Sequence, residues 1–261
     1  MKKLFVFAVS AAVLSLGVSS AQAVVLDLTG ATSEGFINSA LFSRLNKAGS
    51  GTGNIEAFVQ VENNPTEHAY NTTVNNVLDN KNSDQHNHEL LLSAVPLVLV
   101  NNVLYREFLL DLAEPGDDNQ QFISLDEIQI LLSTTPNQSF ETFTGPLVDI
   151  SGTLVYRLDA NADSHILLDS TLAGGQGQRD MFAYIPANLF TGANTQYVYL
   201  YSRFGDTVAT SGAFEEWAVR VGVGDPSTNP VVPEPASFFY RAQNIFPTAQ
   251  YALIFHSKPR R

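Results

Sequence analysis

The chain contains no cysteine, and it is poor in charged residues, especially basic ones. Without cysteine there are no disulfides, thiolate metal sites or cysteine nucleophiles, so the fold must be stabilised by packing. Only 15% of the 261 residues are charged, and 14 Lys and Arg stand against 26 Asp and Glu, which gives a net charge of −12. This charge repels phosphate backbones, so we expect no nucleic-acid partner.

Hydrophobic residues make up 44% of the chain and aromatic residues 10%, enough for a substantial core. From residue 24 to about 223 the dominant hydrophobic period is two, which is typical of strands. The clearest runs are 55–62, 103–112, 122–132, 153–158, 165–172, 181–185, 197–204 and 214–223. Short strands separated by Gly, Asn, Asp and Pro predict an all-β fold, an antiparallel β-sandwich of jelly-roll type.

Two shorter segments carry local signals. Asn101-Asn102 separates two apolar runs and predicts a two-residue hairpin turn, because Asn tolerates positive φ. The segment 33–45 fits either one face of a helix or an alternating strand, and its β-rich surroundings favour strand.

The first 23 residues have the three-part layout of a secretory signal peptide. Lys2 and Lys3 precede an apolar run, and Ala21 and Ala23 form a small-residue cleavage site. The apolar run is short for a membrane span, which takes about 20 residues. We therefore predict an exported protein, cleaved after Ala23, whose sandwich domain occupies residues 24–224.

A polar, proline-bearing linker (225–231) leads to a second sorting signal at 232–261. The signal begins with Val232, Pro233, Glu234, Pro235, Ala236 and Ser237, and the chain ends in Lys258, Arg260 and Arg261. This string and the basic terminus, together with the signal peptide, resemble the sorting tail of PEP-CTERM proteins of Gram-negative bacteria. The resemblance implies that an exosortase, a membrane transpeptidase, processes the tail, which associates transiently with the membrane.

The tail departs from the family pattern in its expected membrane helix. Family members place an unbroken apolar helix after the motif, whereas residues 238–257 here include Arg241 and Pro247. A central Arg costs about 2.5 to 3.5 kcal/mol on insertion scales. We therefore predict that sorting fails in this version, either because the tail has degenerated or because a frameshift follows Ser237.

The body also resembles a recurring PEP-CTERM ectodomain type, in strings such as 107–112, 124–130 and 214–217. That resemblance implies no known activity. Gly-x-Ser-x-Gly, phosphate-loop and metalloprotease motifs are absent, and the adjacent Glu215 and Glu216 point to opposite faces of a strand. We expect a protein that is not an enzyme but has a structural or adhesive role at the cell surface, in exopolysaccharide or biofilm. The alternative is a calcium-dependent carbohydrate-binding module.

Two clusters are candidate sites for that alternative. Asp159, Asn161 and Asp163 have the i, i+2, i+4 spacing that can wrap calcium, although an Asx-rich turn explains them equally simply. Apart from calcium, no cofactor is expected. Tyr197, Tyr199 and Tyr201 lie on one face of a strand; exposed, they form a sugar-stacking platform, and buried, they are ordinary sandwich packing.

Overall fold

The computed structural model describes residues 22–44, 55–81, 85–116, 120–172 and 179–221. The predicted signal sequence through Ala21, the linker and the sorting motif lie outside these residues. Within the described segments the regular structure is β, apart from three single-turn 3-10 helices. The prediction of an all-β fold is confirmed.

The elements follow the chain in a regular succession. The strands are β1 (Val25–Asp27), β2 (Glu34–Ile37), β3 (Ala40–Ser43), β4 (Ile55–Val61), β5 (Glu67–Tyr70), β6 (Leu90–Leu91), β7 (Leu97–Val100), β8 (Val103–Leu112), β9 (Phe122–Ser133), β10 (Phe143–Thr144), β11 (Leu147–Val148), β12 (Thr153–Arg157), β13 (His165–Asp169), β14 (Met181–Pro186), β15 (Tyr197–Phe204) and β16 (Glu215–Arg220). The 3-10 turns are η1 (Leu92–Ala94), η2 (Ser170–Leu172) and η3 (Ala187–Leu189).

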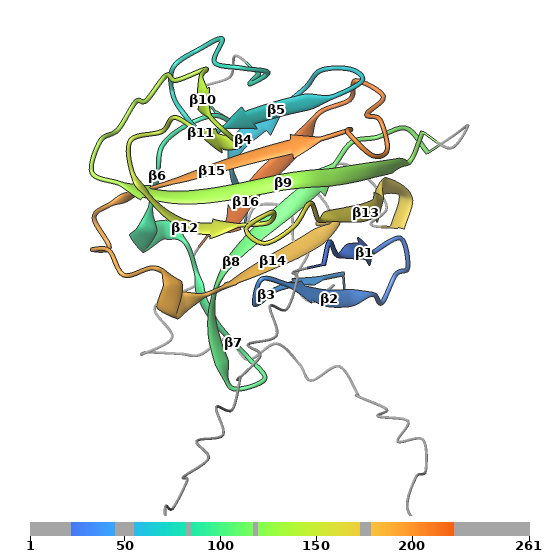
Figure 1. Cartoon of the computed structure of the whole chain (residues 1–261), viewed down its shortest axis with the longest axis horizontal. Coiled ribbons are helices and arrows are strands. Elements are labelled where there is room, and N and C mark those ends of the chain that lie inside the picture. Colours follow the sequence, from blue (N-terminus) through green and yellow to red (C-terminus); the bar gives the residue numbers. More distant parts are fainter. Residues whose placement is uncertain (1–21, 45–54, 82–84, 117–119, 173–178, 222–261) are drawn as a thin grey trace, which may run out of the picture.

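Two seven-stranded sheets form the body, and β9 and β15 of one cross over β8 and β16 of the other (Figure 1). Sheet A has the order β1-β13-β9-β15-β5, with β12 also paired to β9 and β6 to β15. Sheet B has the order β2-β3-β14-β8-β16-β4, with β7 paired to β8. All pairs are antiparallel except β1 with β13. A separate hairpin, β10–β11, adds two strands.

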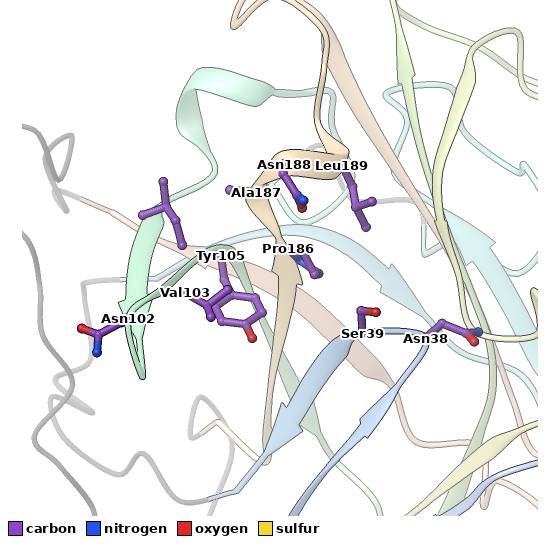
Figure 2. Close-up of a pocket in the computed structure, with 10 residues that line it drawn as sticks. Asn38, Ser39, Asn102, Val103, Tyr105, Pro186, Ala187, Asn188 and Leu189 are labelled. Carbon is purple, nitrogen blue, oxygen red and sulfur yellow. The ribbon is translucent and has the colours of Figure 1, made fainter.

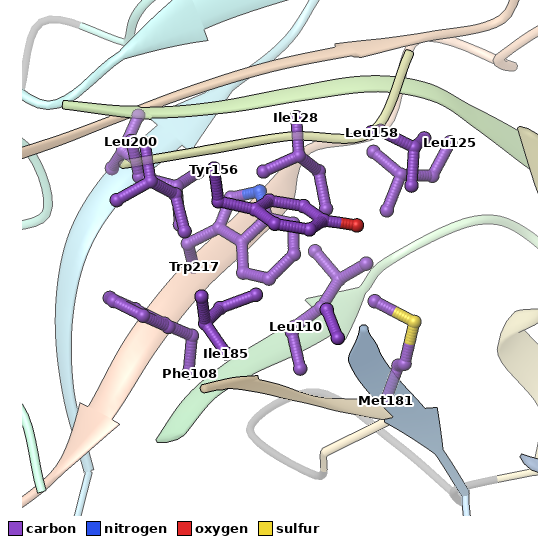
Figure 3. Packing of buried hydrophobic residues seen from close by; sticks show 14 of the residues in the cluster. Phe108, Leu110, Leu125, Ile128, Tyr156, Leu158, Met181, Ile185, Leu200 and Trp217 are labelled. Carbon is purple, nitrogen blue, oxygen red and sulfur yellow. The ribbon is translucent and has the colours of Figure 1, made fainter. Parts of the chain in front are cut away.

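The core lies between the sheets because successive side chains in a strand point to opposite faces. Along β15, Val198, Leu200 and Phe204 belong to the main core, whereas Tyr199 and Tyr201 belong to a cluster on the outer face. Trp217, on β16, is fully buried in the core (Figure 3). Figure 3 shows its ring surrounded by side chains from both sheets, including Leu110, Ile128, Tyr156, Ile185 and Leu200.

The hairpin at Asn101-Asn102 is confirmed, and segment 33–45 is strand, as its surroundings favour, but it forms a hairpin of two strands. Asn101 and Asn102 form the β7–β8 turn with φ of 49° and 64°. Asn38 and Ser39, with φ of 48° and 71°, form a turn between β2 and β3, so segment 33–45 contains two strands. Positive φ at both central residues gives a two-residue hairpin loop the twist that its strands need.

Candidate functional site

The outer face of sheet A carries a pocket of about 350 Å³ lined by His68, Glu127, Phe143, Pro146, Tyr201 and Arg203, which we call the His68 pocket. Three of these residues form one row across neighbouring strands. Arg203 on β15 lies opposite His68 on β5 and opposite Glu127 on β9. Their side chains therefore project from the same face of the sheet, away from the core.

The β10–β11 hairpin contributes Phe143 and Pro146 to the other wall of the pocket. Gln129, which points outward from β9, holds this hairpin with both ends of its amide. Its Nε2 donates to the Pro146 carbonyl at 2.7 Å, and its Oε1 accepts from the Val148 N–H at 3.1 Å. Gly145, at the turn, has φ of +62°, a conformation that suits glycine. The pocket wall is thus fixed to the sheet.

Three rings meet inside the pocket. The His68 and Phe143 rings stack with centroids 5.8 Å apart, and Phe143 meets the Tyr201 ring edge-on at 5.7 Å. His68 Nδ1 and the Tyr201 hydroxyl are hydrogen-bonded at 3.1 Å. Phe143 remains 38% exposed, so part of its ring surface is accessible to a ligand.

The charged groups around the pocket are largely paired with one another. Arg157 Nε lies 2.8 Å from a Glu127 oxygen, and Arg203 Nε lies 2.8 Å from Asp206. Burial raises the pKa of Glu127, and the hydrogen bond from Arg157 opposes that rise. Burial also lowers the pKa of His68, against the attraction of Asp79, so its imidazole is mostly neutral at pH 7.

This chemistry suits binding better than proton transfer. A partly exposed ring can stack on an apolar sugar face, and a neutral imidazole, a phenol and a guanidinium supply hydrogen bonds at its rim. Glycoside hydrolysis needs two carboxyl groups about 5 to 10 Å apart across a cleft. Among the described residues lining the pocket, Glu127 contributes a carboxylate on the outer face, whereas Glu67 turns its side chain into the sandwich.

Of the two alternatives for the tyrosine stripe, the structure shows burial, so an exposed platform is not present. Tyr199 and Tyr201 are 0% and 2% exposed, and Tyr197 is half-buried. The segment after β9 covers them, and the Tyr199 hydroxyl donates to the Thr135 carbonyl at 2.9 Å. The three side chains pack within an outer-face cluster, which is the second alternative for the stripe. Tyr201 still reaches the His68 pocket at one end.

The Asp159 loop connects β12 to β13. Both strands pair with β9, each along a different part of it. Asp159 Oδ1 accepts from the Ser164 N–H at 2.7 Å, a side-chain to backbone hydrogen bond that closes the loop. Asn161 Nδ2 donates to Asn38 Oδ1 at 2.7 Å, and Asp163 is exposed. Across the described segments, no group of three or more acidic or histidine side chains is arranged to hold a metal ion. Calcium binding here stays a prediction.

The Asp159 loop and the His68 pocket are neighbours. The Asp159 N–H donates to Glu127 Oε1 at 3.4 Å, and Arg203 acts electrostatically on the Asp159 carboxylate. Glu127 therefore links the Asp159 loop to the His68 pocket.

A larger, open groove of about 780 Å³ lies between the β2–β3 turn, the start of β8 and η3 (Figure 2). Its polar groups are uncharged, chiefly Ser39, Asn102 and Asn188, and Figure 2 shows the Tyr105 ring beside Val103. Tyr105 is only 5% exposed, so its ring offers little stacking surface. The His68 pocket is the better candidate because charged and aromatic groups converge there.

Of the six residues that define the pocket, sequence reasoning found Tyr201 and missed the other five, His68, Glu127, Phe143, Pro146 and Arg203. Arg203 continues the alternation of the tyrosine stripe by one step, which is a signal for the outer face. His68 and Phe143 lie in short strands with no periodic signal of their own. Of the other predicted sites, Ala23 is exposed directly before the first residue of the fold, and Val232–Ser237 lie outside the described residues.

No family model, curated protein or solved structure matches this chain. Within the described segments there is no helix long and apolar enough to cross a membrane.

Proposed function

We propose that this is an exported protein that acts at the cell surface or in the extracellular polysaccharide matrix as a non-catalytic structural or adhesive component. The observation that carries the proposal is the pair of signals in the sequence, Ala21-Gln22-Ala23 at one end and Val232–Ser237 at the other. Its partners would be an exosortase, which recognises the tail, and exopolysaccharide. No cofactor is required for this role.

The start of the fold supports cleavage after Ala23. The Val24 N–H donates to Ser164 Oγ at 3.0 Å, and the Val24 carbonyl accepts from the His165 N–H at 3.0 Å. Val25 then begins β1. The first residue that cleavage would leave is thus also the first that the sandwich uses.

The strand order supports a jelly roll, a common architecture of binding domains. Taken in chain order, β4, β5, β8, β9, β13, β14, β15 and β16 are the first to eighth strands. Sheet B then reads first, eighth, third, sixth, and sheet A reads second, seventh, fourth, fifth. This interleaving supports the jelly-roll proposal, in which the remaining strands would be additions at the edges.

Fractionation of a Gram-negative host that makes exopolysaccharide tests the proposal. We expect the full chain to leave the cell without a membrane anchor and to be held in the extracellular polysaccharide fraction by the polysaccharide itself. It should be lost to the medium when polysaccharide synthesis is deleted. A chain without residues 2–23 is the control and should stay in the cytoplasm. Cytoplasmic retention of the unmodified chain, or indifference to the polysaccharide, would contradict the proposal.

Carbohydrate binding is the second candidate, and the His68 pocket favours it. A 38% exposed Phe143 beside a neutral His68 and the Tyr201 hydroxyl offers stacking and hydrogen bonding to one sugar unit. Because the chain carries a charge of −12, a neutral glucan should bind better than a polyuronate. Calcium at the neighbouring Asp159 loop would make this binding calcium-dependent.

Affinity electrophoresis in gels containing hydroxyethylcellulose or alginate measures this binding. The full chain should be retarded by the neutral glucan, and Phe143→Ala should remove the retardation. Phe140→Ala is the matched control, because Phe140 is 43% exposed but does not line the pocket. Equal retardation of both variants would reject the pocket as the site.

A further inference from the structure

Two glutamates from opposite sheets meet inside the sandwich, on the side of the sheets that faces the core. Glu67 begins β5 in sheet A, and Glu215 begins β16 in sheet B. Both are 0% exposed, and their carboxyl groups lie close enough to act electrostatically on one another. The residues two positions further along each strand, Ala69 and Trp217, belong to the main core.

Three of the four carboxyl oxygens of this pair have no hydrogen-bond donor from any other group. They are Glu67 Oε1 and both oxygens of Glu215. The fourth, Glu67 Oε2, accepts from the Asn63 N–H at 2.9 Å. Two ionised carboxylates in this position would each lose several kcal/mol of hydration without a compensating contact. If one of the two carboxyl groups is protonated, it loses its charge, and its O–H can donate to the other carboxyl group.

The charged groups around the pair are acidic, and their repulsion further favours protonation of Glu67 and Glu215. Glu114, two residues after β8, is 6% exposed and accepts from the Ser211 N–H with both oxygens. Asp180 is paired with Arg44, whose Nη2 lies 3.4 Å from its Oδ1. The charged groups that face the pair are Glu114 and Asp79 toward Glu67, and Glu114 and Asp180 toward Glu215.

We propose that Glu67 and Glu215 share a proton across the interior and form an acid-stabilised clamp between the two sheets, which weakens as the solution becomes alkaline. An exported protein meets the pH of its surroundings, so such a clamp makes the stability of the sandwich depend on that pH. The clamp does not rest on the carbohydrate-binding proposal, because the His68 pocket lies on the outer face of sheet A.

Burial decides in which direction the stability of the fold changes with pH. It raises the pKa of Glu67 to about 7 and that of Glu215 well above its ordinary value, so the folded chain keeps protons that the unfolded chain releases. The stabilisation is complete below the ordinary glutamate pKa and is lost as pH rises through the folded values. The folding equilibrium constant should fall about tenfold per pH unit for each such proton.

Unfolding of the full chain by urea between pH 5 and pH 9 tests the clamp. The wild-type constant should fall across this range, and Glu215→Gln should remove at least about one tenfold step per pH unit. Asp180, whose pKa burial raises to about 8, contributes to the slope of every variant, so the difference between variants is the readout. Glu56→Gln, at an exposed position on β4, is the control and should keep the wild-type slope.

Two further measurements keep the inference testable if Glu215→Gln folds poorly. Infrared spectra at pH 6, where ordinary glutamates are ionised, should contain a stronger protonated-carboxyl band in the wild-type chain than in Glu67→Gln, since Asp180 contributes to both spectra. Any stabilisation by calcium at pH 8 should be the same in Glu67→Gln as in the wild-type chain, because the pair holds a proton and not the ion. Equal bands in the two chains, an unchanged slope in Glu215→Gln, or a calcium stabilisation that Glu67→Gln abolishes would overturn the shared proton.

Discussion

Trp217 and Ser202 are joined by a buried hydrogen bond that links the two sheets: Trp217 Nε1 donates to Ser202 Oγ at 3.1 Å. Both residues are 0% exposed. Ser202 is a polar residue on the inward face of β15, between Leu200 and Phe204 of the core. Its hydroxyl therefore gives the largest core side chain a partner that no aliphatic residue would supply.

Ser202→Ala should destabilise the fold by about 1 to 3 kcal/mol, because it leaves the indole N–H buried without an acceptor. Chemical denaturation measures the change in the free energy of unfolding. Ser93→Ala, at an exposed position in η1, should change it by no more than about 0.5 kcal/mol. Equal effects of the two substitutions would show that the hydrogen bond contributes little.

Asn38 joins the β2–β3 turn to the end of β12. Its Nδ2 donates to the carbonyls of Arg157 at 3.0 Å and Leu158 at 2.6 Å. Asn38→Gly keeps the positive φ but loses these bonds, so we expect a loss of about 1 to 3 kcal/mol. Asn101→Gly is the matched control, because Asn101 has nearly the same φ and an exposed side chain. It should cost a few tenths of a kcal/mol at most.

If the Asp159 loop binds calcium, the ion should raise the melting temperature of the chain after EDTA treatment. The gain is about 1.4 kcal/mol when free calcium is about ten times its Kd. Asp163→Ala should remove the shift, since Asp163 is exposed and its loss leaves the Asp159–Ser164 contact in place. Magnesium at equal ionic strength is the control. No calcium-specific shift would leave the loop as an Asx-rich turn.

The strands were predictable because their information is local. The boundaries of Val103–Leu112 and Tyr197–Phe204 follow from alternation within each segment and match the structure. The His68 pocket was not predictable, because its residues come from strands far apart in the chain and meet only through sheet register. The sequence left open whether Tyr199 is exposed or buried, because the segment that covers it is irregular and has no periodic signal.

The segment after the sorting motif is expected to prevent sorting, and the DNA that encodes it tests the reason. Because Arg241 and Pro247 interrupt the segment after the motif, the chain should be released uncleaved and soluble. Under the frameshift hypothesis, the DNA read in a shifted frame after the codon for Ser237 encodes a continuous hydrophobic helix followed by arginines. If neither alternative frame does so, degeneration explains the tail. Efficient cleavage at the motif with retention at the surface would contradict the membrane argument itself.

N-terminal sequencing of the protein recovered from cell fractions decides whether the chain is exported. We expect a chain outside the cytoplasm that begins at Val24, the residue whose N–H contacts Ser164 Oγ at 3.0 Å. A soluble cytoplasmic chain that begins at Met1 would contradict this expectation.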